Sequence, residues 1–172
     1  MLTIGAALGV VGVYVFGLSQ PARHVVGATD TWSVPPAEVW ALLSDPLARP
    51  RWRPDVDRIA LISETAEGAT YRELDAGGDR FDFRVVDVVL GRRLTLEVAA
   101  PEQIGFHGGW TWELAPVAEG TRVTVTEDGT IDNPLFRGIY GLTRSQWATV
   151  EQELRLLGGH LDVAVHPERS AR

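Results

Sequence analysis

The sequence contains no cysteine and no lysine. Without cysteine there can be no disulfide, thiolate nucleophile, iron–sulfur cluster or cysteine zinc site. Without lysine there can be no Walker A phosphate loop and no Schiff-base chemistry. All 16 basic residues are therefore arginine, and the formal net charge is −7. The arginines form no basic stripe, so we do not expect nucleic acid, which needs a positive face, as a partner.

Histidine is also scarce, and its positions are not those of a metal site. The four histidines are His24, His107, His160 and His166, and no two of them have the spacing of metal ligands. Neither an H-E-x-x-H motif nor a G-x-S-x-G motif occurs in the sequence. His107 falls on the outward parity of a predicted strand and is expected to be solvated. We predict no metal and no cofactor. No catalytic motif is recognised, which favours a non-catalytic protein without deciding the question.

The first twenty residues form a segment of their own. Residues 2–18 read LTIGAALGVVGVYVFGL, carry no charge, and would span about 25 Å as a helix. This length is at the short end for a bilayer, and frequent glycine is typical of membrane helices. We predict a transmembrane helix within residues 1–20. A cleaved signal peptide and a buried core helix are the alternatives, although the run lacks both a positive start and a polar face.

The charges beside this segment predict its orientation. Arg23 and His24 follow the run and nothing basic precedes it, so the positive-inside rule places the rest of the chain in the cytoplasm. We therefore expect a single-pass protein of the cell membrane. Residues 21–24 would be a short linker, residues 25–163 one domain, and residues 164–172 a disordered tail. The oligomeric state stays open.

The remaining sequence is typical of a globular α+β domain, with 45% hydrophobic and 23% charged residues. Strand-like alternation and turn residues predict seven strands, at 25–34, 56–64, 69–75, 79–90, 92–99, 106–115 and 121–131. The inner positions of 79–90 change parity, which predicts a β-bulge near Val85. Ala37 to Ser44 should form a short helix. From Asn133, a plausible N-cap, an apolar stripe through Leu161 predicts one long amphipathic helix.

Three stretches together resemble the START-like (SRPBCC) superfamily, which includes birch-pollen-allergen-type proteins and polyketide cyclase/dehydrase relatives. They are WSVPPAEVWALLSD at 32–45, PRWRPDV at 50–56 and GTRVTVTEDGTIDNPLFR at 120–137. The resemblance implies a helix-grip fold, in which a curved seven-stranded antiparallel sheet wraps around the long C-terminal helix and leaves a cavity. Family members hold lipids, sterols or polyketides there, and some catalyse cyclisation or dehydration. The membrane segment is a departure, and fold alone does not decide function.

Strand parity indicates which side chains face the cavity. In 106–115 the aromatic positions share one face with Leu114, and in 121–131 Glu127 shares the inner face with two valines. A buried carboxylate needs a partner or must become neutral. Glu127 could bind a ligand's polar end or act as acid or base. Alternatively, the strand ends there and Glu127 meets solvent or pairs with Arg137.

The predicted ligand site combines this carboxylate with aromatic and apolar side chains and with two tyrosine hydroxyls as orienting donors. Its residues are Trp52, Tyr71, Phe83, Leu96, Trp110, Trp112, Glu127, Phe136, Tyr140 and Trp147. For each single tryptophan, filling the core between sheet and helix is the plainer interpretation, whereas for the group some contact with the cavity is expected. We expect a membrane-tethered binder or carrier of a hydrophobic small molecule or lipid. The alternatives are a cyclase/dehydrase-like enzyme that uses Glu127, and a non-catalytic membrane scaffold.

Overall fold

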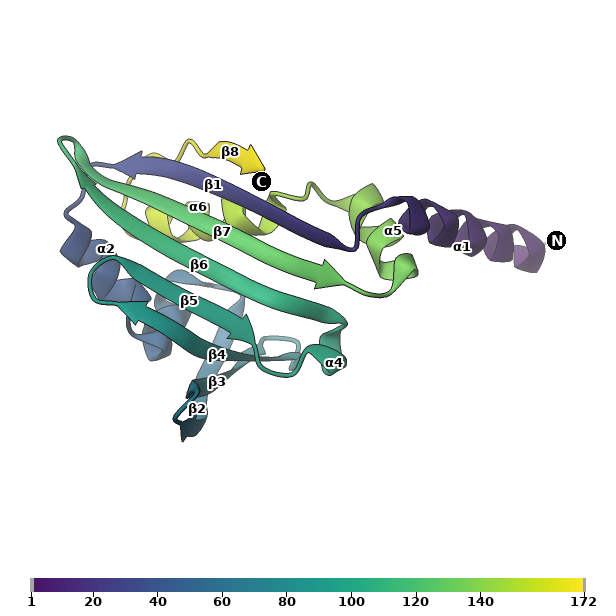
Figure 1. Ribbon diagram of the computed structural model, residues 1–172, viewed down its shortest axis with the longest axis horizontal. Coiled ribbons are helices and arrows are strands. Elements are labelled where there is room, and N and C mark those ends of the chain that lie inside the picture. Colours follow the sequence, from purple (N-terminus) through teal and green to yellow (C-terminus); the bar gives the residue numbers. More distant parts are fainter. Residues whose placement is uncertain (1, 172) are drawn as a thin grey trace.

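The computed structural model describes the backbone of residues 2–171 and the side chains of residues 9–102 and 104–170. A single antiparallel sheet dominates the structure, with strand order β2-β3-β4-β5-β6-β7-β1-β8 (Figure 1). The strands are β1 Arg23–Trp32, β2 Val56–Thr65, β3 Gly68–Asp75, β4 Arg80–Val89, β5 Arg93–Val98, β6 Phe106–Val117, β7 Gly120–Ile131 and β8 Glu168–Ala171.

The helices lie at the ends and on one face of this sheet. They are α1 Leu2–Ser19, α2 Pro36–Leu43, the 3₁₀ turn Pro46–Ala48, α3 Arg49–Trp52, α4 Pro101–Ile104, α5 Pro134–Thr143 and α6 Ala148–His160. Helix α6 packs against β1 and β7, and α3 packs against α6. The arrangement is the α+β architecture expected from the sequence, with seven of the eight strands at the predicted places.

The core lies between the sheet and helices α2 and α6. Its most buried side chains are at most 1% exposed and include Trp32, Val39, Phe83, Trp112, Val123, Val125, Val150, Leu154 and Leu157. Burying this apolar surface is the main force that holds α6 on the sheet. The predicted inner parity of β6 and β7 is thus confirmed, and His107 lies on the outer side, half-exposed and 2.7 Å from Asp132.

Local sequence signals are also confirmed. The register of β4 against β5 shifts between Val85 and Asp87, where the bulge was predicted. The side chain of Asn133 accepts a hydrogen bond from the Leu135 amide at 2.9 Å and so caps α5. These features depend on residues close together in the chain, which is why the sequence alone was sufficient to predict them.

The prediction of one long C-terminal helix is wrong. The segment forms two helices, α5 and α6, and at Arg144 the backbone is extended, with φ −136° and ψ 149°. The two halves of the apolar stripe bury against different partners. Leu154 of α6 is fully buried on the sheet, whereas α5 packs against α1 and leaves Phe136 51% exposed.

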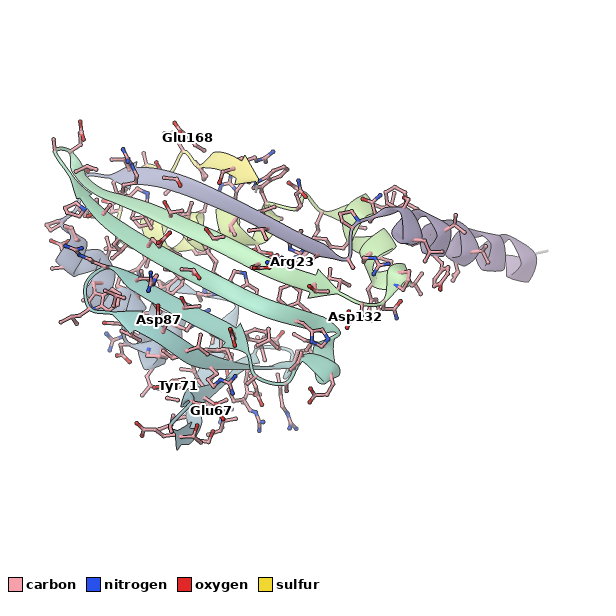
Figure 2. All side chains as sticks on the ribbon, viewed as in Figure 1. Arg23, Glu67, Tyr71, Asp87, Asp132 and Glu168 are labelled. Carbon is pink, nitrogen blue, oxygen red and sulfur yellow. The ribbon has the colours of Figure 1, made fainter. Side chains whose placement is uncertain are left out.

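The C-terminal tail also differs from expectation. Residues 164–172 were predicted to be disordered, but residues 168–171 form β8, which pairs antiparallel with β1. Arg169 forms an ion pair with Glu151 of α6 and stacks over the Trp147 ring at 5.4 Å. The sheet therefore has eight strands rather than seven. Figure 2 labels Glu168, the first residue of β8, and Arg23, the first residue of β1.

The N-terminal segment is helical, as predicted, and α1 projects away from the sheet (Figure 1). Strand β1 begins at Arg23, inside the stretch 21–24 that was expected to be a linker. Across the part of the chain that the structure describes, no helix combines the length and the apolarity needed to cross a membrane. The transmembrane helix predicted within residues 1–20 therefore has no support from the structure.

Candidate functional site

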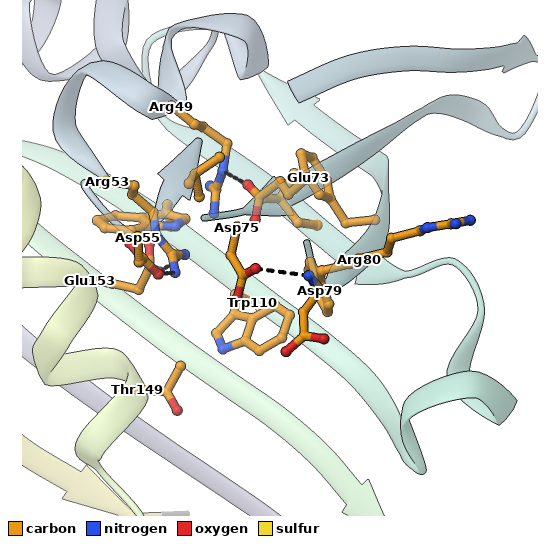
Figure 3. Close-up of a pocket in the computed structure, with 15 residues that line it drawn as sticks. Arg49, Arg53, Asp55, Glu73, Asp75, Asp79, Arg80, Trp110, Thr149 and Glu153 are labelled. Atoms are coloured by element: carbon orange, nitrogen blue, oxygen red, sulfur yellow. Dashed lines mark hydrogen bonds and ion pairs between the residues drawn. The ribbon is translucent and has the colours of Figure 1, made fainter. Parts of the chain in front are cut away.

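A cavity of about 280 Å³ opens between the sheet, the α3 region and α6. One side is apolar and is formed by side chains of β4, β5 and β6, namely Phe81, Phe83, Leu96, Trp110 and Trp112. The opposite side is ionic and is formed from α3 and the residues after it, β3, and α6. Figure 3 shows these charged side chains gathered around one end of the cavity, with Thr149 and Glu153 reaching in from α6.

The first ion pair on the polar side joins Arg49 and Glu73. Both residues are buried, 7% and 6% exposed, and the Arg49 Nε donates to Glu73 Oε1. The guanidinium also lies 5.2 Å from the ring centroids of both Trp52 and Phe83. The arginine is thus held between two aromatic rings, where cation–π attraction adds to the ion pair. This geometry fixes one charged wall of the cavity.

The second ionic group is centred on Arg53. Its guanidinium donates to Glu153 and to Asp55, the latter from Nε at 3.2 Å. Burial opposes the charge on Arg53, but the carboxylates of Glu153, Asp55 and Glu73 outweigh this and raise the pKa of the arginine. The hydrogen bond from Arg53 in turn lowers the pKa of Asp55. Arg53 is therefore a permanent cation at the cavity wall.

Glu153 is the least satisfied group in the cavity. Its side chain is 7% exposed, one oxygen accepts from Arg53, and the other, Oε2, is buried without a hydrogen-bond partner. Burial raises the pKa of the Glu153 carboxyl, against the opposing effect of Arg53 and Arg49. A buried polar atom without a partner costs roughly 1–3 kcal/mol, so Oε2 is an acceptor whose hydrogen-bonding capacity the described side chains leave unused.

Glu127 is buried, as the strand parity predicted, but it has other partners than expected. It is 2% exposed and lies within β7, so neither alternative of a strand end nor of solvent exposure holds. One oxygen is 2.6 Å from His24 Nε2, and the other accepts from Trp110 Nε1 at 2.7 Å. Arg137 donates instead to backbone carbonyls, one of which is Gly17 O. Glu127 lies opposite Trp110 on the neighbouring strand and is not among the residues that line the cavity.

Four of the ten predicted ligand residues line the cavity, and the other six, which include Glu127, do not. The four are Phe83, Leu96, Trp110 and Trp112. Trp52 lies beneath it, edge-on to Trp112 at 6.1 Å, and Tyr71 stacks on Phe83 at 5.6 Å. Phe136 is exposed on α5, Tyr140 faces a separate pocket, and Trp147 donates to the Ser170 carbonyl. Their role as ligand contacts stays a prediction.

Sequence reasoning missed the ionic residues of the cavity. Glu73 is two residues after Tyr71 in the same strand, so strand parity would have placed it on the face that Tyr71 was predicted to share with the ligand. Nothing comparable marks Arg49, Arg53 or Glu153, because their partners are distant in the chain. Within residues 2–171, no cluster of three or more histidine, aspartate or glutamate side chains is placed to hold a metal ion.

Comparison with known proteins gives a family and a fold. The model of the family described as "Polyketide cyclase / dehydrase and lipid transport" matches residues 23–158. No curated protein sequence matches the chain. A START superfamily protein from Mycobacterium smegmatis is 17% identical over 81% of this chain and 97% of its own, with a TM-score of 0.60.

Two enzymes have similar structures. Zhui aromatase/cyclase from Streptomyces sp. R1128 is 18% identical and covers 81% of this chain and 94% of its own, with a TM-score of 0.57. Norcoclaurine synthase from Thalictrum flavum is 10% identical over 81% of this chain and 95% of its own, with a TM-score of 0.60. At these identities the likeness concerns the fold alone.

Proposed function

Because the chain belongs to the polyketide cyclase/dehydrase and lipid transport family, we propose that its cavity binds a compact hydrophobic molecule with one polar end. The apolar wall of β4, β5 and β6 would contact the ligand body. The ionic wall would orient its polar group. A volume of about 280 Å³ lies at the lower limit of small-molecule sites, which favours a single ring system or a short acyl chain over a diacyl lipid.

The unpartnered Oε2 atom of Glu153 is the observation on which this proposal depends. The atom is buried, it belongs to a residue that lines the cavity, and one ligand hydrogen bond would satisfy it. A core that was complete by itself would have no reason to leave this atom without a partner. The third alternative, a scaffold whose cavity is filled by its own side chains, does not account for either the volume or the atom.

We expect native mass spectrometry of the full chain to reveal a co-purified small molecule. Glu153→Gln keeps the size of the side chain and removes its ability to ionise. Because burial raises the pKa of Glu153, rising pH converts a carboxyl that can donate into a carboxylate that can only accept. In the wild type, retention of a ligand that accepts from Glu153 should fall as the pH rises, and retention of a donor ligand should increase.

The matched control is Glu151→Gln, because Glu151 lies on the same helix, is also buried, and is paired with Arg169 rather than facing the cavity. The pH dependence of retention should vanish in Glu153→Gln and persist in Glu151→Gln. No bound molecule in any preparation, or an identical pH response in both variants, would refute the cavity as a ligand site.

The second candidate function is acid–base catalysis through Glu127. The observation in its favour is the 2.6 Å contact with His24, since a histidine–carboxylate pair can hold or move a proton. Against it, both carboxylate oxygens already have partners, and Glu127 is not among the residues that line the cavity. We therefore prefer ligand binding to catalysis as the proposed function.

Glu127→Gln separates the two functions. If the protein only binds, retention of the co-purified ligand should stay within about twofold of the wild type, because the amide can still accept from Trp110 and donate to His24. If Glu127 supports catalysis, turnover of a polyketide substrate should fall by about 10²–10⁴-fold. Mass spectrometry of the ligand before and after incubation measures both quantities.

A tether to the membrane through α1 belongs to the same proposal. Residues 1–22 carry no charged side chain, and the described part of α1 exposes the large hydrophobic side chains of Val10, Val11, Tyr14, Val15 and Leu18. A helix of this kind gains free energy by burying its surface in a lipid phase. The tether would hold the cavity close to a reservoir of apolar ligand. Binding of the full chain to vesicles of phosphatidylcholine, measured by flotation, tests this part of the proposal separately.

A further inference from the structure

Two arginines, Arg137 of α5 and Arg144 directly after it, lie near the first residues of β1 and have no carboxylate partner among the described residues. Arg137 of α5 donates from Nε to Gly17 O at 3.1 Å, and from Nη1 to Ile131 O at 2.8 Å and Asp132 O at 3.0 Å. These are neutral carbonyls, so the charge of the guanidinium is not compensated. Neither Arg137 nor Arg144 takes part in any of the ion pairs found among the described residues.

Both arginines line a pocket of about 300 Å³ where α1 ends and α5 turns toward α6. Gln20, His24 and Tyr140 line the same pocket, and all three carry hydrogen-bond donors. Burial raises the pKa of Tyr140, so its phenol stays neutral and able to donate. Glu127 is the nearby acid, but both of its oxygens are engaged by His24 and Trp110. The pocket thus offers two unpaired cations and several donors, as an anion requires.

Exposed apolar side chains lie on α1 and α5, the two helices that meet beside this cationic pocket. Large hydrophobic residues on the two helices that meet there are 44–60% exposed: Val10, Val11, Tyr14, Val15, Leu18, Phe136, Ile139 and Leu142. Soluble proteins seldom expose apolar side chains in such a concentration. In Figure 1, α1 and α5 lie side by side at one end of the molecule, away from the β6–β7 turn.

Close glycine contacts keep the two helices together. A Cβ atom at Gly17 would lie 1.7 Å from the Pro134 carbonyl oxygen, and one at Gly138 would lie 2.1 Å from the Val13 carbonyl oxygen. Only glycine allows the backbones to approach this closely. The Arg137 bond to Gly17 O adds a polar link across the same junction. The apolar surfaces and the pocket therefore form one surface with a fixed geometry.

We propose that this junction is a docking surface for an anionic phospholipid. The headgroup phosphate binds in the pocket between Arg137, Arg144 and Tyr140, and the exposed faces of α1 and α5 contact the acyl chains. This inference rests on the proposed membrane association of α1 and specifies the lipid that the association selects. It does not involve the ligand cavity, which has no lining residue in common with this pocket.

Because the chain has a negative net charge, a preference for anionic over neutral vesicles tests the cationic pocket directly. A protein with a formal net charge of −7 is repelled by an anionic membrane, so it can prefer such a membrane only through a local cationic site. Apolar insertion of α1, in contrast, contributes equally to binding of neutral and anionic vesicles. The ratio of the two affinities therefore reports on the pocket, and the affinity for neutral vesicles reports on the tether.

The experiment measures flotation of the full chain with vesicles of phosphatidylcholine and of an equimolar mixture of phosphatidylcholine and phosphatidylglycerol. We expect a preference for the mixture that decreases about fivefold in Arg144→Gln, because one arginine near an anionic surface contributes about that factor. The matched control is Arg122→Gln, which removes the same charge from an exposed position at the far end of β7 and should leave the preference unchanged.

Three results would overturn the proposal. The first is equal or weaker binding to the anionic vesicles, and the second is the same loss in the Arg122 and Arg144 variants. The third is saturable binding of inorganic phosphate, measured by calorimetry, in a protein without preference for phosphatidylglycerol, which would assign the pocket to a soluble phosphate. Failure to bind phosphatidylcholine would refute the tether, and a loss of binding to the mixed vesicles in Arg144→Gln but not in Arg122→Gln would still test the pocket.

Discussion

Replacement of Glu73 with alanine is expected to lower the free energy of unfolding by about 3–5 kcal/mol. The change leaves Arg49 as a buried cation between the Trp52 and Phe83 rings, without the carboxylate that compensates it. The cost arises mainly from this unpaired charge rather than from the loss of one attractive contact. Urea unfolding followed by far-ultraviolet circular dichroism measures the difference.

Asp87→Ala is the matched control, because it breaks the Arg93–Asp87 pair, whose side chains are 42% and 44% exposed. Solvent screens that pair, and its loss should cost at most about 1 kcal/mol. The double variant Arg49→Met with Glu73→Leu should recover most of the stability, because it removes both charges and keeps the volume. Equal losses in Glu73→Ala and Asp87→Ala would contradict the burial of the Arg49–Glu73 pair.

Trp112→Ala should have an effect of similar size, about 3–5 kcal/mol, for a different reason. Trp112 is 1% exposed, packs edge-on against Trp52 at 6.1 Å, and forms part of the cavity wall. Its removal leaves an apolar hole that the rigid sheet cannot close. Because such holes can bind small aromatic molecules, added indole should restore part of the lost thermal stability.

The control for this prediction is Trp147→Ala. Trp147 lies at the start of α6, where its indole donates to the Ser170 carbonyl at 2.9 Å and contacts Arg169. Its loss should cost about 1–2 kcal/mol, from one hydrogen bond and the burial of part of the ring, and indole should not restore it. A comparable loss at both tryptophans would mean that the core does not lie between α6 and the inner face of β6.

The ionic cavity shows how a structural requirement and a binding function can share residues. Arg49 and Glu73 neutralise each other in a buried ion pair, and we expect the loss of Glu73 to lower the free energy of unfolding. Arg53 and Glu153 are also paired, yet one oxygen of Glu153 remains without a partner. The two pairs lie on the same wall of one cavity. We therefore expect the Glu73 variants to act on folding and the Glu153 variant to act on ligand retention.

The sequence by itself determined the sheet, its inner face and the local signals at its turns. Alternation along β6 placed Trp110, Trp112 and Leu114 on one face, and the change of parity in β4 located the bulge at Val85. These features follow from a period of two residues and from short-range capping, which a single chain segment specifies without the rest of the fold. The same regularity placed Glu127 on the inner face, but it left open whether the strand ended there and exposed the carboxylate to solvent.

Only the tertiary structure decided which groups meet. Glu127 bonds to His24, which is 103 residues away, and Arg53 bonds to Glu153, which is 100 residues away. The C-terminal helix divides because α5 finds a partner in α1 at Gly17 and Gly138, while α6 stays on the sheet. A hydrophobic stripe specifies that a helix must bury a face, but it does not specify against which element. That choice depends on the free energies of competing long-range contacts, which local periodicity does not contain.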